Sequence, residues 1–381
     1  MTPYLSVVVP AHNAAAVLER SLSALAQSDL PRASWELIVV DDASTDDTGL
    51  VAARFADTAV LLAGNPHGPA YSRNRGAEAS RGEVLVFVDA DVVVHPDTLG
   101  RIATTLARRP EVSALFGSYD VRPAAQGIVS QYRNLLHHYV HLRAVGEAET
   151  FWSGLGAMRR SVFFEAGMFD EWHYARPQIE DIELGRRLRR QGHRILLDPA
   201  VQATHLKEWT FWRMIANDFR NRGLPWMRLM LREGLDRTSG GLNIRLAERA
   251  CTALVAAGMA ALPLSVLWRT WWPLTVTAAA LVLALVVNAG FYRYLWRRRS
   301  ARFTVGVIPL HLIYYVGNVV AVFAGWLVHV LFGTPIPPPA ADALARSGIR
   351  TWPPPLRRPS ESIWLTRAPS ALRRERNGVG S

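Results

Sequence analysis

The chain has 381 residues, half of them hydrophobic, and its single cysteine, Cys251, excludes an internal disulfide or a cysteine-based zinc site. The formal net charge of +11 comes entirely from residues 250–381, so residues 1–249 are formally neutral. Because this positive excess lies beside apolar segments, it indicates a membrane surface as partner and argues against nucleic acid.

The first hundred residues alternate strand-like apolar runs with segments of helical spacing. Short runs rich in valine and leucine predict buried parallel strands at residues 5–9, 35–40, 59–62 and 84–88. The alternation predicts a doubly wound α/β fold, with a mostly parallel sheet and helices on both faces. No basic segment precedes the first run, so we expect a strand there and not a signal peptide.

The following residues are less regular. Strands are expected at residues 112–117 and 195–197, and a glycine-rich strand or loop at residues 151–157. Residues 180–191 predict a strongly charged helix. Residues 209–219 interleave aromatic and basic side chains, which is typical of a helix at a membrane interface.

Three apolar runs follow, at residues 250–268, 274–289 and 303–332. The first two approach the roughly 20 residues needed to cross a bilayer, and the third exceeds that length. Arginines between residues 293 and 302 mark a cytoplasmic loop by the positive-inside rule, which agrees with a cytoplasmic N-terminal domain. A third crossing would place the arginine-rich tail outside the cytoplasm, against the positive-inside rule. The third run is therefore re-entrant, or it is split near Gly317, or the tail is an exception to the rule.

These patterns divide the chain into three parts. Residues 1–230 are expected to form the α/β domain, and residues 231–333 an interfacial segment with two to three transmembrane helices. Residues 334–381 are rich in proline and arginine, which predicts a disordered tail.

Acidic clusters follow the predicted strands. Asp41-Asp42 comes after the second strand and Asp89-Ala90-Asp91 after the fourth, while Glu180-Asp181 opens the charged helix. Ligands of open α/β sheets bind outside the carboxyl ends of the strands. Carboxylates placed there suit a divalent metal and a diphosphate, so they suggest chemistry on a nucleotide-linked substrate.

Five segments in this order resemble the family-2 glycosyltransferases, which have the Rossmann-like GT-A fold. The resemblance covers residues 3–215, and the apolar runs are similar to those of membrane-bound members. The segments are Ser6-Val7-Val8-Val9-Pro10-Ala11-His12-Asn13, Val40-Asp41-Asp42-Ala43-Ser44-Thr45-Asp46, Ala70-Tyr71-Ser72-Arg73-Asn74-Arg75-Gly76, Phe87-Val88-Asp89-Ala90-Asp91 and Glu180-Asp181-Ile182-Glu183-Leu184-Gly185-Arg186-Arg187-Leu188.

The resemblance assigns roles to particular residues. It makes Asp181 the catalytic base, oriented by Glu180, and Asp91 the ligand of Mg²⁺ or Mn²⁺. Asp89 would face the metal or the donor ribose, and His205 would be a further metal ligand. The other residues expected to contact the donor are Pro10, His12, Asp42 and Arg73. Those expected on the acceptor side are Trp152 and Gly154.

Each of these residues also has a purely structural interpretation. Asp89 and Asp91 suit a polar turn, and Glu180 and Asp181 suit an acidic first helical turn, which the helix dipole favours. His205 suits a buried or interfacial position. If the acceptor is a lipid phosphate, no strong base is needed, and Asp181 would only position it.

The sequence therefore predicts a membrane-bound, inverting, metal-dependent glycosyltransferase of the hexosyltransferase type. It would move one sugar from a nucleotide-sugar to a lipid-linked or glycan acceptor of the cell envelope. Multi-pass insertion in the inner or cell membrane with a cytoplasmic catalytic domain is expected. Processive synthesis is disfavoured because Phe219-Arg220-Asn221-Arg222-Gly223 lacks a Gln-x-x-Arg-Trp motif.

Other classes fit less well. A non-catalytic GT-A-fold membrane scaffold or nucleotide-sugar-binding protein would have no reason to keep every acidic pair. A transporter would need ionisable groups inside the apolar runs, and a dinucleotide oxidoreductase would need Gly-x-Gly-x-x-Gly after the first strand.

Overall fold

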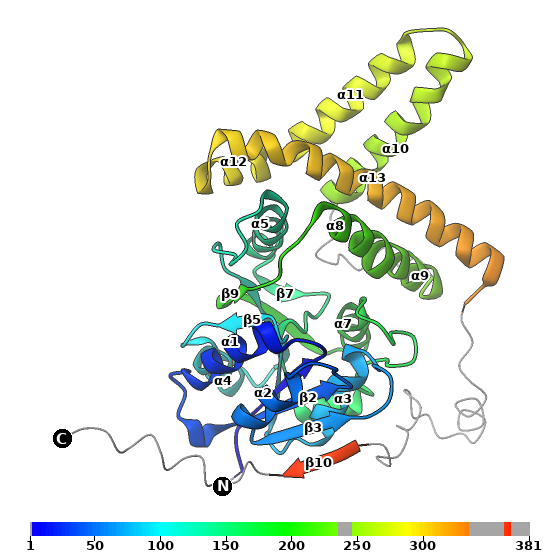
Figure 1. The fold of residues 1–381 in the computed structure, drawn as a ribbon. Helices are drawn as coiled ribbons and strands as arrows, with labels where there is room; N and C mark the ends of the chain where they lie inside the picture. Colours follow the sequence, from blue (N-terminus) through cyan, green and yellow to red (C-terminus); the bar gives the residue numbers. More distant parts are fainter. Residues whose placement is uncertain (1, 235–245, 335–361, 367–381) are drawn as a thin grey trace.

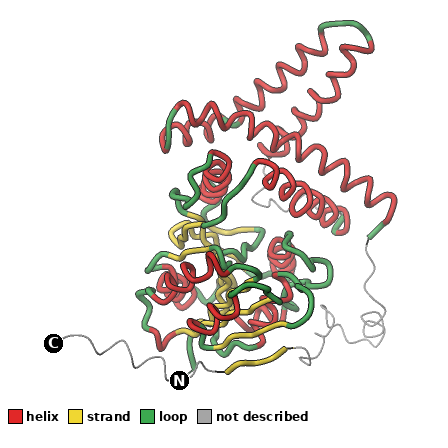
Figure 2. The backbone as a smooth tube through the Cα atoms, viewed as in Figure 1, coloured by secondary structure: helices red, strands yellow, loops and turns green. Residues whose placement is uncertain are grey.

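The computed structural model describes residues 2–234, 246–334 and 362–366. They form an α/β domain whose sheet is flanked by helices, and long helices extend from one side of it (Figure 1). Figure 2 shows that the strands lie in the α/β domain, whereas the described part of the extension is helical.

Four parallel strands form the N-terminal half of the sheet, in the order β3-β2-β1-β4. Their residues are mostly aliphatic and most are buried, as expected of parallel strands covered on both faces. The predicted alternation with helices is confirmed. The elements are β1 (Leu5–Ala11), α1 (Ala15–Ala26), β2 (Trp35–Asp42), α2 (Thr48–Phe55), β3 (Thr58–Leu62), α3 (Pro69–Glu78), β4 (Val84–Val88) and α4 (Thr98–Arg108).

Beyond β4 the sheet is mixed, which corrects the expectation of a mostly parallel sheet. It continues in the order β4-β8-β6-β9-β5, and only the pair β6 and β9 is parallel in this half. A hydrophobic run indicates that a strand is buried, but it does not indicate whether the strand pairs parallel or antiparallel. The sequence therefore did not reveal the antiparallel pairs. These strands are β5 (Val92–Val94), β6 (Val112–Tyr119), β7 (Gly146–Ala148), β8 (Leu155–Arg159) and β9 (Arg194–His205).

The sheet separates two hydrophobic cores. Along β1, Val7 and Val9 face one core, and Val8 faces the other, because successive side chains of a strand point to opposite faces. All three are fully buried. This two-sided burial fixes the register of β1, and with it the position of the loop that follows the strand.

Strand β9 is longer than the predicted run at residues 195–197 and continues through Pro199. Its pairing with β6 is irregular between Phe116 and Ser118, and Pro199 lies in that interruption. Proline cannot donate to a sheet ladder and is tolerated at such irregularities. The extension of β9 carries His205 back to the edge where β4 ends.

Helices cover the second half of the sheet and lead toward the extension. A π-helix, η2, joins α8 and α9 and contains Asn221 and Arg222. The expected domain boundary at residue 230 falls inside α9. These helices are α5 (Ile128–Leu142), α6 (Arg160–Glu165), α7 (Glu180–Arg190), α8 (Phe211–Asn217), η2 (Asp218–Gly223) and α9 (Leu224–Arg232).

The extension holds the three predicted apolar runs. Helices α10 (Leu246–Leu267) and α13 (Ala301–Phe332) are each long and apolar enough to cross a membrane. Helix α11 (Trp272–Val287) and helix α12 (Ala289–Arg298) would together supply one more span, but they are bent by 56° to each other. Two or three spans are therefore compatible with the described residues, as expected.

Helix α13 contacts the α/β domain near both of its ends. Just before it, Arg299 Nη2 donates to the Val121 carbonyl at 2.7 Å. Toward its other end, Gly325 packs so closely on α9 that an added Cβ would lie 2.6 Å from the Met227 side chain. Figure 1 shows α13 running across the domain while α10 and α11 project away from it. The helix is continuous through Gly317, where a split was one of the expected alternatives.

One short segment of the predicted tail is described. Strand β10 (Ser362–Thr366) pairs antiparallel with β3 at the edge of the sheet. The prediction of disorder otherwise concerns residues 335–361 and 367–381, which lie outside the described residues.

Candidate active site

A cavity of about 1540 Å³ lies at the carboxyl ends of β1, β2 and β4. It reaches from this edge of the sheet to helices α10 and α13. All of the residues to which the resemblance gives a role line it, although they come from seven separate segments of the chain. They are Pro10, His12, Asp42, Arg73, Asp89, Asp91, Trp152, Gly154, Glu180, Asp181 and His205.

Asp42 is buried at the end of β2 and holds the loop before α3. Its carboxylate accepts hydrogen bonds from the backbone N–H groups of His67 at 2.9 Å and Gly68 at 2.7 Å. Gly68 has a φ of +96°, a conformation that favours glycine. The His12 ring is exposed, and its Nδ1 lies 2.7 Å from the Asp42 carbonyl oxygen. The first and second strand ends are thus held together at the expected donor side of the cavity.

Arg73 is directed into an acidic cluster and not toward solvent. It is 4% exposed, and its guanidinium bonds Asp89 Oδ1 at 2.6 Å and Glu180 Oε1 at 2.9 Å. Both bonds are charge-assisted and therefore strong. Arg73 links the end of β4 to the start of α7 on the wall of the cavity. Asp89 is likewise occupied by Arg73 on one of its two oxygens.

Asp91 and His205 form a second pair on the cavity wall. Asp91 Oδ2 lies 3.5 Å from His205 Nε2, and the His205 ring stacks on Tyr119 with centroids 4.3 Å apart. Burial raises the pKa of Asp91, but the hydrogen bond and charge of His205, together with Lys207, outweigh burial and hold it below its usual value. The carboxylate is therefore ionised at neutral pH.

This pair suits a partial site for Mg²⁺ or Mn²⁺. Two ligand atoms about 2.1 Å from one octahedral ion lie about 3 Å apart, close to the observed separation. Among the described residues, no third histidine, cysteine or acid completes a metal cluster. Mg²⁺ commonly takes one or two protein ligands and completes its shell with substrate phosphates and water. The residues present therefore fit a metal that is held jointly with a diphosphate.

Asp181 is positioned by the loop that precedes β8. Its Oδ2 accepts from the Ser153 backbone N–H at 3.1 Å and from Ser153 Oγ at 3.3 Å. Burial and the neighbouring Glu180 carboxylate raise the pKa of Asp181 to about 6, while Ser153, Arg73 and Arg222 act in the opposite direction. A carboxylate with a pKa near the working pH is suited to accept a proton.

Aromatic side chains line the wall beside Asp181. The Trp152 indole packs edge-to-face on Tyr119 at 4.8 Å and contacts the His137 ring at 4.6 Å. Gly154 permits this placement, because a Cβ there would lie 2.6 Å from the indole ring. Burial lowers the pKa of His137 well below its usual value, so its ring is neutral at pH 7.

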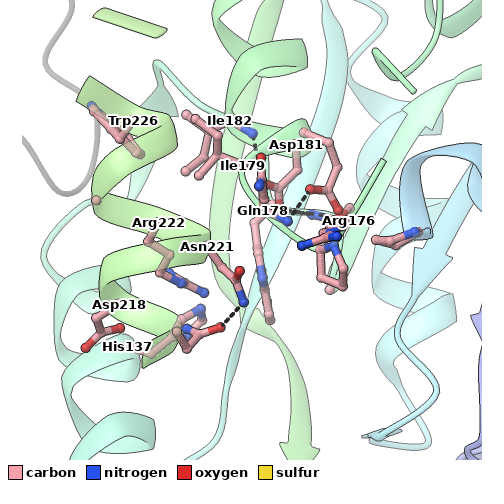
Figure 3. Close-up of a pocket in the computed structure, with 18 of the residues that line it drawn as sticks. His137, Arg176, Gln178, Ile179, Asp181, Ile182, Asp218, Asn221, Arg222 and Trp226 are labelled. Carbon is pink, nitrogen blue, oxygen red and sulfur yellow. Dashed lines mark hydrogen bonds between the residues drawn. The ribbon is translucent and has the colours of Figure 1, made fainter. Parts of the chain in front are cut away.

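The sequence interpretation gave no role to several side chains that the structure brings to the cavity. Asn221 and Arg222 of η2 and Trp226 of α9 line the same cavity as Asp181 and Gln178 (Figure 3). The π-helix is a geometry that recurs at functional sites. In the sequence, this segment stands out only because it lacks a Gln-x-x-Arg-Trp motif. The mixture of arginine, asparagine and tryptophan just before the first apolar run was the available signal.

The far end of the cavity is formed by the helical extension. Tyr314, Val319, Phe323 and Trp326 of α13 line it, together with Glu248 of α10. The cavity therefore has a polar end at the sheet and a largely apolar end among the long helices.

Comparison with known proteins gives one family. Residues 6–166 match the sequence profile of glycosyl transferase family 2. Glycosyltransferase AglE of Haloferax volcanii is 31% identical over 109 residues, which cover 28% of this chain and 36% of AglE. Probable glycosyltransferase YdaM of Bacillus subtilis is 27% identical over 212 residues, covering 52% of this chain and 50% of YdaM.

A third relative is the Escherichia coli enzyme WfgD, named as a UDP-Glc:alpha-D-GlcNAc-diphosphoundecaprenol beta-1,3-glucosyltransferase. It is 28% identical over 124 residues, covering 32% of this chain and 48% of WfgD. The matched segments thus span half or less of each of these three relatives.

Among solved structures, the chain resembles the mannosyltransferase PcManGT from Pyrobaculum calidifontis, determined in complex with GDP-Man and Mn²⁺. The TM-score is 0.54 at 20% identity, over 85% of this chain and 88% of PcManGT. At this identity the likeness establishes the fold, and it confirms the predicted GT-A architecture.

Proposed function

We propose, from the match of residues 6–166 to glycosyl transferase family 2, that the chain transfers one sugar from a nucleotide-sugar to a lipid-linked acceptor at a membrane. The observation that carries this proposal is the single cavity that joins the acidic strand ends to the long apolar helices. One substrate would enter from each end, and the two would meet at Asp181.

The donor is assigned to the sheet end of the cavity. Pro10, His12 and Asp42 line this end, and the Asp42 carboxylate holds the loop before α3 through the His67 and Gly68 backbone N–H groups and the His67 ring. PcManGT was determined with GDP-Man and the name of WfgD includes UDP-Glc, which supports a nucleotide-sugar as the donor class. Arg73 would act here indirectly, by holding Asp89 and Glu180 in place.

A divalent metal fits beside Asp91 and His205. When bound there with the donor, it would supply positive charge next to the departing diphosphate. Asp91 is ionised and Tyr119 fixes the plane of the His205 ring, so both side chains are oriented for such binding before the donor arrives.

Asp181 is proposed to take the proton from an acceptor hydroxyl. The hydroxyl oxygen would form a bond to the anomeric carbon as the bond from that carbon to the diphosphate breaks. The nucleoside diphosphate would leave with the bonding electrons, the proton would pass to Asp181, and the configuration would invert. A pKa of about 6 allows Asp181 to be ionised at pH 7 and still to bind a proton.

The acceptor is assigned to the other end of the cavity. Its wall there is formed by α9, α10 and α13, and includes Trp226, Phe323 and Trp326. An acceptor with a lipid tail could lie among these helices and present a hydroxyl group to Asp181. The name of WfgD includes a diphosphoundecaprenol acceptor, which supports this class.

The membrane arrangement follows from the helices. We propose that α10 and α11 cross the bilayer as a hairpin, and that α13 lies along the interface with the α/β domain. Exposed apolar side chains on α10 and α11, among them Val266, Val282 and Val286, would then face lipid. The arginines at residues 297–299 would lie on the cytoplasmic side with the catalytic domain.

Transfer is tested with the purified full-length chain in lipid nanodiscs. Labelled UDP- and GDP-sugars are supplied with Mn²⁺ and a polyprenyl-linked sugar acceptor. Asp91→Ala and Asp181→Ala should each abolish transfer in a folded protein, while Asp97→Ala, which changes a largely solvent-accessible acid just before α4, should not. Turnover near the wild-type rate in either cavity variant would refute the assignment. Donor binding without any turnover would instead favour a non-catalytic nucleotide-sugar-binding protein.

A further inference from the structure

A second, smaller cavity of about 160 Å³ lies where three parts of the molecule meet. These parts are the loop at residues 173–178, the helices η2 and α9, and the C-terminal end of α13. Of its lining residues, only Gln178 also lines the large cavity. The small cavity is therefore a separate site.

Its lining is strongly basic. Arg220, Arg228 and Arg232 contribute guanidinium groups, His173 and His329 contribute imidazoles, and no carboxylate belongs to the lining among the described residues. Arg228 and Arg232 are four residues apart on α9, an arrangement in which like charges repel and destabilise the helix. An anion bound between them would relieve this repulsion.

The nearby acids are engaged elsewhere. Asp170 is buried and bonds His173, and Arg232 contributes to the low pKa of Asp170. Glu233 bonds Arg186 and Arg190, each at 2.7 Å. By contrast, within the part of the chain that the structure describes, none of the three arginines of the small cavity forms an ion pair. Their charge is available to a ligand.

We propose that this cavity binds the phosphate headgroup of an anionic membrane lipid. Guanidinium groups match phosphate oxygens through paired hydrogen bonds, and basic pockets beside membrane helices suit such headgroups. The cavity includes His329 and Gly333 at the end of α13, where Val330, Leu331 and Phe332 are exposed. Those apolar side chains would meet the acyl chains of the same lipid, which favours a lipid over free phosphate.

The site would attach α9 and the end of α13 to one leaflet, independently of sugar transfer. The inference requires that the helices meet a membrane, but it does not require the proposed catalytic activity. A failure of one can therefore be told from a failure of the other.

The test measures the thermal unfolding of the full-length chain in a neutral detergent, with lipid added. Phosphatidylglycerol should raise the unfolding midpoint of the wild type, and phosphatidylcholine should not. The double variant Arg228→Gln, Arg232→Gln should bind phosphatidylglycerol roughly tenfold more weakly or worse, because charge-assisted bonds are lost. The matched control Arg108→Gln, on α4, should behave as the wild type.

Two controls keep the outcome decisive. Arg220→Gln alters an exposed arginine, so it supplies a second variant if the double variant unfolds without lipid. Inorganic phosphate at the same concentration should have no effect. Equal stabilisation by inorganic phosphate would overturn the lipid assignment, and an unchanged response in both cavity variants would overturn the site.

Discussion

The substitution Asp181→Asn should abolish transfer and at the same time stabilise the folded protein. In the folded chain the pKa of Asp181 rises from 3.8 to about 6, mainly through burial and then through the charge of Glu180. Each pKa unit corresponds to about 1.36 kcal/mol, so the ionised side chain costs up to about 3 kcal/mol of stability. Asparagine has no charge and can still accept the bond from the Ser153 backbone.

We expect a gain of roughly 1–3 kcal/mol at pH 7.5, because partial exposure of the carboxylate screens some of the cost. The gain has a pH signature. Above pH 6, Asp181 is ionised in both the folded and the unfolded chain, so the wild type carries the full cost. Below the unfolded pKa of 3.8 it is protonated in both states, and the cost vanishes. The stability difference should therefore shrink as pH falls from about 6 to about 4.

The assay is reversible urea unfolding of the full-length chain in detergent, followed by tryptophan fluorescence between pH 4 and pH 8. Transfer activity is measured on the same samples. A variant that is no more stable than the wild type at pH 7.5, or a difference that does not change with pH, would refute the assigned electrostatics. A stabilised variant that retains transfer would refute the role of base while leaving the electrostatics intact.

Further predictions concern the neighbours of Asp181, the metal pair and the topology. Because the Glu180 charge raises the pKa of Asp181, Glu180→Gln should move the acid limb of the pH profile of kcat/KM to lower pH. Arg73→Met should move that limb to higher pH and destabilise the fold by about 3–5 kcal/mol in urea unfolding, since it leaves a buried acid unpaired. Chelation by EDTA should remove activity from the wild type, with recovery on adding Mn²⁺, and Asp91→Ala should show no recovery. In a background without the native cysteine, a cysteine at Thr334 should react with an impermeant maleimide from the side of the catalytic domain, and one at Arg269 only from the opposite side. Labelling of both positions from the same side would contradict the proposed hairpin.

Four of the five strands in the first hundred residues, all except β5, could be predicted because their signals are local. Val84–Val88 is a continuous apolar run, and the acids after it fall at the edge of any sheet that buries such a run. The convergence of Asp42, Asp89 and Glu180 on one cavity followed from that reasoning together with the resemblance to a known family. The predicted residues did gather there.

What the sequence did not reveal depends on distant partners. Arg73 and Glu180 are 107 positions apart, so no local pattern shows that the arginine is already bonded to an acid. The path of β9 through Pro199 depends in the same way on an irregularity in β6. The place of Arg222 in the cavity depends on the wider turn of a π-helix, which hydrophobic spacing does not encode.

Helix α13 also bears on the distance between the catalytic domain and the membrane surface. Arg299 anchors its start and the contact between Gly325 and Met227 fixes its later turns, so it has no free hinge against the catalytic domain. If it rests on the lipid headgroups, Asp181 stands at a constant elevation above the leaflet. The chain would then select acceptors by the length of the spacer between their lipid tail and the reacting hydroxyl group.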